Sequence, residues 1–184
     1  MKKILAIICL GFATLGYSQD KIEESFKKNE IKGNAISLVF GYPEFSYERI
    51  LNNESSIGVS IGFAADKNID TKFTLSPYYR FYFGKKPAAG FFVEGFAMVR
   101  SIKLQKNYYY SNYNDPSYYE HYVKDESYTD FALGFGLGSK WITKKGFLFE
   151  INAGIGRNLT NSDKNDFYDL TIVGKGGITV GYRF

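Results

Sequence analysis

Strict alternation between large apolar residues and very small residues is the feature that most constrains how this chain can fold. From Ser56 to Ala64, the residues Ile57, Val59, Ile61 and Phe63 alternate with Gly58, Ser60, Gly62 and Ala64. The segments 131–141 and 73–83 repeat the pattern. Successive side chains of a β-strand point to opposite faces, so each segment is predicted to be a strand with one strongly apolar face.

The same reasoning places eight strands along the chain. They are expected at about 34–41, 44–52, 56–64, 73–83, 90–105, 131–141, 147–157 and 171–184. Pro77 lacks an N–H group and is expected to mark a bulge in the fourth strand. The fold class predicted is therefore all-β.

The two faces distinguish a membrane barrel from a soluble sandwich or lipocalin-like barrel. A face of Gly, Ala and Ser is too small for a soluble exterior, whereas a narrow lumen needs small residues. The mean hydropathy of -0.24 excludes several apolar helical spans, but alternating strands average to such a value. We therefore favour an antiparallel eight-stranded up-and-down transmembrane β-barrel over the soluble alternative.

The first residues are typical of a secretory signal peptide. Lys2 and Lys3 precede an apolar run, and cleavage is expected after Ser18. The predicted organisation is a signal peptide at 1–18, a polar periplasmic lead segment at 19–33 and the barrel at 34–184. Cys9 is the one cysteine and follows Ile7 and Ile8 rather than small residues, which disfavours a lipoprotein.

The C-terminal strand ends on an aromatic residue. Ile178, Val180, Tyr182 and Phe184 alternate up to the last position, and this resembles the strand that the assembly machinery of bacterial outer-membrane barrels reads. The stretches 45–49 and 77–83 are similar to strands of uncharacterised members of the "outer membrane protein beta-barrel domain" type. The resemblance covers about 34–184 and implies an outer-membrane location. It implies little about activity, because such proteins have diverse roles.

Ionisable residues are expected inside the barrel. They are Glu48, Arg80, Glu94, Arg100, Lys140, Glu150 and Arg183. Turns centred on Pro87 and Lys145 would place Arg80 opposite Glu94 and Lys140 opposite Glu150. Buried charges need partners, and an eight-stranded lumen is narrow enough for side chains to fill. We expect a charge-plugged lumen, with a narrow channel for small molecules as the alternative.

An up-and-down barrel has both termini at the periplasmic end. Short periplasmic turns are expected at 52–54, 84–89 and 143–146, and outer connections at 41–43, 66–70, 106–127 and 158–170. The third outer connection holds Tyr108, Tyr109, Tyr110, Tyr113, Tyr118, Tyr119 and Tyr122. These tyrosines are candidates for surface recognition; alternatively, the flanking strands extend past the membrane and carry them.

The sequence offers no recognisable catalytic set. His121 is the one histidine, and no cluster has the spacing of metal ligands. We expect a structural or surface-interaction protein that is not an enzyme and has no cofactor. Its expected partners are outer-membrane lipid and lipopolysaccharide, the barrel-assembly machinery and an extracellular ligand. Scattered basic residues argue against nucleic acid, and a monomer is expected.

Overall fold

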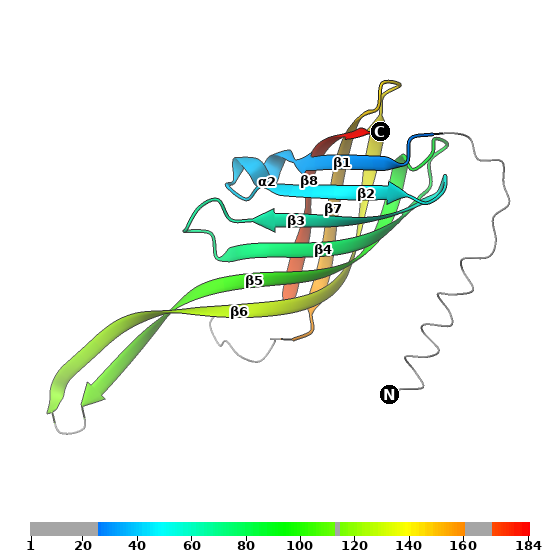
Figure 1. Cartoon of the computed structure of the whole chain (residues 1–184). Coiled ribbons are helices and arrows are strands. Elements are labelled where there is room, and N and C mark those ends of the chain that lie inside the picture. Colours follow the sequence, from blue (N-terminus) through cyan, green and yellow to red (C-terminus); the bar gives the residue numbers. More distant parts are fainter. Residues whose placement is uncertain (1–25, 113–114, 161–170) are drawn as a thin grey trace, which may run out of the picture.

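The computed structural model describes residues 26–112, 115–160 and 171–184, which form a closed β-barrel (Figure 1). The strands are β1 Asn29–Asn34, β2 Glu44–Ile50, β3 Ser55–Phe63, β4 Thr71–Tyr82, β5 Gly90–Asn112, β6 Asp115–Ile142, β7 Phe147–Asn158 and β8 Ile172–Arg183, with helix α2 Ala35–Val39 between β1 and β2. Each strand pairs antiparallel with its sequence neighbours. The predicted all-β, eight-stranded up-and-down architecture is confirmed.

The barrel closes where β1 pairs with β8. At the end of this seam the backbone N–H of Phe184 donates to the Asn29 carbonyl at 2.8 Å, and the Asn29 N–H donates to the Phe184 carbonyl at 3.1 Å. Closure of this kind removes the open sheet edges that an unclosed sheet would expose. The pairing continues to the final residue of the chain.

The first strand lies earlier than predicted. Residues 34–41 were expected to form it, but β1 spans Asn29–Asn34, and Ala35–Val39 is helical. The boundary between a lead segment at 19–33 and a barrel at 34–184 is therefore wrong. The strand escaped detection because its inward positions are charged and only Ile31 supplies a large apolar outward side chain, which is 58% exposed.

Helix α2 begins after an N-cap at Asn34. The apolar residues that follow it led to the prediction of a strand there. The Asn34 side chain accepts a hydrogen bond from the Ser37 N–H at 3.3 Å, and the Ser37 hydroxyl donates to the Asn34 carbonyl at 3.1 Å. Asparagine is a favoured N-cap. The first outer connection, expected at 41–43, is thus the longer stretch 35–43.

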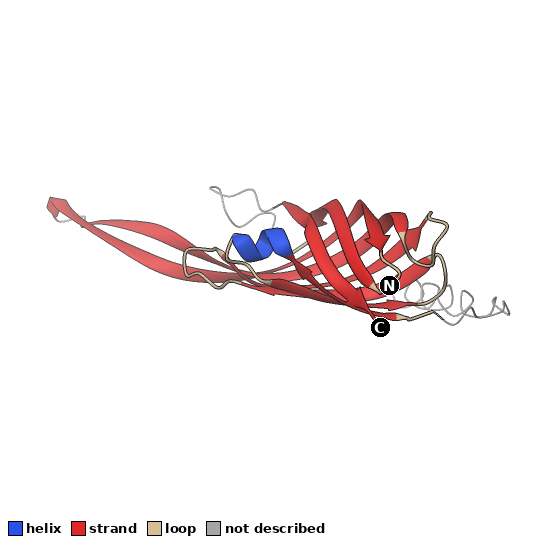
Figure 2. Ribbon diagram, turned by 90° about the horizontal axis from the view of Figure 1, so that it is seen from above, coloured by secondary structure: helices blue, strands red, loops and turns tan. Residues whose placement is uncertain are grey.

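The longest hairpin projects well beyond the rest of the barrel (Figures 1 and 2). The strand predicted at 90–105 continues to Asn112, and the strand predicted at 131–141 already begins at Asp115. Most of the stretch expected as an outer loop at 106–127 is therefore a two-stranded ribbon. The strands on either side of this stretch therefore extend into it and carry most of its tyrosines.

The remaining connections agree with the predicted alternation of short turns and outer loops. The short turns at the end that carries the C-terminus span 51–54, 83–89 and 143–146, and the second outer loop spans 64–70. The predicted signal peptide at 1–18, residues 19–25 of the lead segment and most of the connection 158–170 lie outside the described residues.

Pro77 does not produce the predicted bulge. The β4–β5 register is the same on both sides of it, with Leu75 opposite Val99 and Tyr78 opposite Phe96. The Ser76 hydroxyl donates to the Ala97 carbonyl at 2.8 Å and supplies a donor where proline has none. The register shift in this pair of strands lies between Thr71 and Phe73.

The two faces of the sheet divide as predicted. Outward side chains are large and apolar, and Ile57, Phe83 and Phe135 are 50%, 61% and 70% exposed. Inward side chains are glycine, serine, aromatic or charged, and most are buried. Among the described residues, no helix is long and apolar enough to cross a membrane.

Candidate functional site

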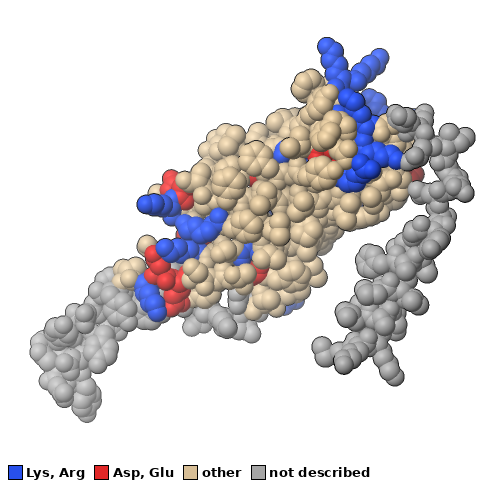
Figure 3. Space-filling model, viewed as in Figure 1, with Lys and Arg blue, Asp and Glu red and all other residues tan. Residues whose placement is uncertain are grey.

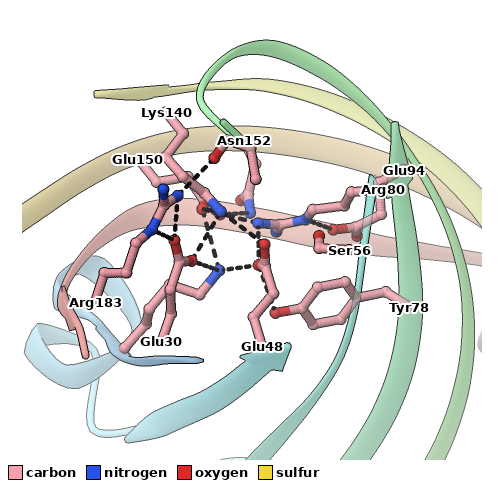
Figure 4. Close-up of polar contacts among 12 residues, drawn as sticks. Glu30, Glu48, Ser56, Tyr78, Arg80, Glu94, Lys140, Glu150, Asn152 and Arg183 are labelled. Atoms are coloured by element: carbon pink, nitrogen blue, oxygen red, sulfur yellow. Dashed lines mark hydrogen bonds and ion pairs between the residues drawn. The ribbon is translucent and has the colours of Figure 1, made fainter. Parts of the chain in front are cut away.

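The candidate site is an ionic network that crosses the lumen (Figure 4). Both predicted cross-strand pairs are present in the backbone register: Arg80 on β4 is opposite Glu94 on β5, and Lys140 on β6 is opposite Glu150 on β7. The register follows from turn length and from the alternation of faces. Contacts beyond those neighbours come from strands on different sides of the barrel.

Glu48 on β2 is the centre of the network. One carboxylate oxygen lies 2.5 Å from the Lys32 ammonium and 2.9 Å from Arg80 Nη1, and the other lies 2.7 Å from the Lys140 ammonium. The Tyr82 hydroxyl also donates to Glu48, at 2.6 Å. The side chain is 0% exposed. Charge-assisted bonds of this number compensate a carboxylate for the loss of water.

Arg80 bridges three carboxylates. Its Nε lies 2.7 Å from Glu94, and its Nη1 lies 2.8 Å from Glu150 in addition to the contact with Glu48. The guanidinium carbon lies 4.4 Å from the Tyr78 ring centroid and 4.3 Å from that of Phe92. Planar guanidinium groups combine forked hydrogen bonding with contact to ring faces, so this side chain is fixed on several sides.

The shortest contacts of Lys140 are with residues of β1 and β2, not with its cross-strand neighbour Glu150. Its ammonium lies 2.8 Å from Glu30 and 2.7 Å from Glu48 but 3.9 Å from Glu150. It also donates to the Tyr82 hydroxyl at 2.5 Å. The predicted register is thus correct, while the principal ionic partners of Lys140 belong to β1 and β2 on the other side of the lumen.

Arg183 connects the network to a turn at the end of the barrel. Its Nε donates to Glu30 at 2.8 Å, and its two terminal nitrogens donate to the carbonyls of Pro87 and Ala88 at 2.7 and 2.8 Å. Ala88 has a positive φ of 44°, a conformation that costs energy in a residue other than glycine. The arginine holds this strained turn over the lumen.

The opposite end of the lumen is a cup. A cavity of about 340 Å³ is lined mainly by hydroxyl-bearing side chains, together with Glu44, Arg100 and Lys175. Beneath it lies a space of only about 20 Å³ that reaches Arg80 and Glu150. Lys175 contacts Glu94 at 2.5 Å, and Arg100 contacts Asp130 at 3.2 Å. The lumen is therefore wide on the loop side and filled at the network.

All seven inward residues predicted from the sequence lie on the lumen side, and the network includes others that the prediction missed. The additional charged residues are Glu30, Lys32, Asp130 and Lys175. Glu30 and Lys32 were missed because their strand was assigned to the lead segment. Asp130 lies directly opposite Arg100 in the β5–β6 register, and extending the predicted strands would have revealed that pair.

The other predicted site residues lie outside the lumen. Val180, Tyr182 and Phe184 are exposed on the outer face, and Ile178 is partly buried. In the long hairpin, Tyr108 pairs with Tyr122, Tyr109 with His121, and Tyr110 with Glu120, while Tyr119 pairs with Ser111. Tyr118 lies on β6, and Tyr113 is outside the described residues. No group of three or more potential metal-binding side chains occurs in the described part of the chain.

The closed eight-stranded barrel with an ion-paired lumen and an apolar exterior has the architecture of small outer-membrane β-barrels. The family model "Protein of unknown function (DUF3575)" matches residues 4–176, and the chain belongs to that family. The fold is similar to the N-terminal β-barrel domain of Pseudomonas aeruginosa OprF, with a TM-score of 0.52, 18% identity and coverage of 86% of this chain and 98% of that one. No curated protein matches the sequence.

Proposed function

We propose that this protein is a non-catalytic barrel of the Gram-negative outer membrane whose lumen is closed by the ionic network. The observation that carries the proposal is the burial of Lys32, Arg80 and Lys140 together with Glu30, Glu48 and Glu150, whose side chains are at most 2% exposed. These residues come from β1, β2, β4, β6 and β7 and meet across the lumen. Ion pairs between strands on different sides of the lumen stabilise the closed barrel.

The dimensions of the lumen support closure rather than passage. A cavity must offer roughly 10–15 Å³ to hold one water molecule. The space of about 20 Å³ beside Arg80 and Glu150 therefore holds one or two waters. Moving an ion through this level would require at least one buried ion pair to separate. Separating a buried pair leaves two desolvated charges without compensation, which is costly, so spontaneous opening should be rare.

The alternative function is a narrow channel, and the cup of about 340 Å³ is the observation that favours it. Single-channel recording in planar bilayers separates the two. We expect the wild-type protein to show no stable openings. Stable openings whose conductance changes in Glu94→Gln or Glu150→Gln would show that ions pass the network, and the plug would then be refuted.

The outer-membrane location rests on the apolar exterior and on the predicted signal peptide at 1–18. Each of the eight strands carries at least one exposed aromatic or aliphatic side chain on its outward face. Such a surface suits lipid and would not remain dispersed in water. We propose cleavage after Ser18, insertion by the barrel-assembly machinery through the terminal strand, and a monomer that contacts outer-membrane lipid and lipopolysaccharide.

The surface role is proposed for the long hairpin. Its backbone extends beyond the last pairings of β4 and β7, which reach Ile102 on β5 and Ala132 on β6. A ribbon that far from the barrel has backbone edges and a tyrosine-rich sequence available to an extracellular ligand. Deleting 108–122 tests this. Loss of surface binding with retained heat-modifiable migration is expected, and unchanged binding would refute recognition by the hairpin.

A further inference from the structure

One end of the barrel is strongly basic. The exposed side chains there are Lys27, Arg49, Lys85, Lys86, Lys144 and Lys145, here called the basic collar. They lie beside the chain terminus and on the short turns between β4 and β5 and between β6 and β7. Among the described residues at this end, Glu54 is the one exposed acidic side chain. Figure 3 shows Lys and Arg gathered over this end, whereas the opposite end carries both signs of charge.

An aromatic girdle lies next to the basic collar on the outer face. The exposed rings are Phe83, Phe91, Trp141, Phe147, Tyr182 and Phe184. Several touch one another: the centroids of Phe83 and Phe91 are 5.9 Å apart, and those of Phe147 and Tyr182 are 5.4 Å apart. Lys27 lies 5.3 Å from the Tyr182 centroid, so the collar and the girdle are continuous.

Aromatic belts sit at the level of lipid headgroups. Side chains immediately beyond such a belt therefore meet the headgroup phosphates. The opposite end carries both signs of charge, since Lys103 contacts Asp125 at 2.7 Å and the loop that holds Lys67 also holds the exposed Asp66 and Asp70. The basic collar is the surface with an excess of one sign.

We propose that the basic collar binds anionic phospholipid headgroups in the periplasmic leaflet of the outer membrane. This inference rests on the proposed function, because it requires the barrel to be inserted with the C-terminal end facing the periplasm. Exposed ammonium groups above an interfacial aromatic belt attract lipid phosphates that carry net negative charge. The collar would anchor the barrel at a fixed depth and enrich anionic lipid around it.

Trp141 provides the measurement. It is the one tryptophan of the chain and lies in the girdle with 52% of its surface exposed. Lys144 and Lys145 lie in the short turn that directly follows its strand. Its fluorescence is quenched by lipids with brominated acyl chains that contact it. The protein is reconstituted in vesicles of equimolar phosphatidylcholine and phosphatidylglycerol, with one lipid brominated at a time, so both leaflets offer the anionic lipid.

We expect brominated phosphatidylglycerol to quench more strongly, with a relative binding constant of about fivefold. The variant K144Q/K145Q should bring the preference close to unity, and so should salt at about 1 M. The control K67Q/K124Q removes the same charge at the opposite end and should keep the preference. Heat-modifiable migration of each variant confirms that the barrel has formed.

The outcomes separate this inference from the proposed function. Equal quenching by both lipids in the wild-type protein would overturn the basic collar as a lipid site while leaving the membrane barrel intact. A preference that survives in K144Q/K145Q but disappears in K67Q/K124Q would also overturn it. Absence of quenching by either lipid would place Trp141 outside the bilayer and refute the membrane barrel itself.

Discussion

Replacing Glu48 with glutamine tests how strongly the lumen network holds the barrel. The substitution keeps the shape of the side chain and removes one negative charge. In the wild-type protein, Glu48 contacts Lys32 at 2.5 Å, Lys140 at 2.7 Å and Arg80 at 2.9 Å. After the change, the three cations retain Glu150, which lies within 3.9 Å of each of them, but they lose the carboxylate that makes the shorter contacts with Lys32 and Lys140.

The structure sets the expected magnitude. Removing one partner from a buried ion pair costs about 3–5 kcal/mol, because the cations stay buried with less compensation. The glutamine carbonyl still accepts one or two hydrogen bonds, which places the cost near the lower value. We therefore expect the free energy of unfolding to fall by about 3 kcal/mol, which is roughly a hundredfold change in the unfolding equilibrium.

The assay is reversible urea unfolding in lipid vesicles, followed by the fluorescence of Trp141 and by heat-modifiable migration. The matched control is Asp125→Asn, which removes a carboxylate from a 2.7 Å pair with Lys103 whose side chains are about half exposed. Exposed pairs contribute little, so this variant should unfold like the wild type. Equal, small effects of the two substitutions would refute the claim that the buried network stabilises the barrel.

Two further predictions concern the walls and the hairpin. Gly134→Ala should lower the free energy of unfolding by about 1–3 kcal/mol, because its Cβ would lie 2.6 Å from the Ile155 carbonyl oxygen and 2.7 Å from Gly156 Cα. Gly95→Ala, with no atom within 4 Å of its Cβ, should be neutral in the same urea assay. A larger loss of stability in Gly95→Ala than in Gly134→Ala would contradict the packing argument. In the hairpin beyond the barrel, a hydrogen bond from the Lys103 ammonium lowers the pKa of Asp125 below its ordinary value. Lys103→Gln should raise that pKa toward the ordinary value in an NMR titration. Since the pKa is depressed in the folded protein, the pair favours folding above the ordinary pKa and loses that contribution as pH falls; an unchanged titration would show that the pair does not form.

The backbone register was predictable because two simple constraints agree. The turns at 83–89 and 143–146 are short, and the period-two pattern allows only registers that keep inward residues opposite inward residues. Among the few registers that these constraints allow, the ones with turns centred on Pro87 and Lys145 place Arg80 opposite Glu94 and Lys140 opposite Glu150, as the structure has them. Local spacing therefore specifies which residues share a pair of neighbouring strands.

The β1 strand was not predictable by the same means. Its inward residues Glu30, Lys32 and Asn34 are polar, so the segment lacks the contrast between apolar and small residues that marks the others. Glu48 on the neighbouring strand is one partner of those charges, but the others, Lys140 and Glu150, lie more than 100 residues away in sequence. Pairwise patterns along the chain carry no information about contacts across a lumen.

Closure of the barrel and neutralisation of its lumen depend on the same residues. The seam between β1 and β8 places Glu30 opposite Arg183, and Glu30 also accepts from Lys140 at 2.8 Å. Without β1 in position, Lys140 would lose Glu30, and Glu48 would lose Lys32. Buried charges without partners are costly, so an open barrel cannot bury its lumen charges favourably. The charged first strand, which made β1 hard to recognise, therefore couples the last step of closure to the completion of the network.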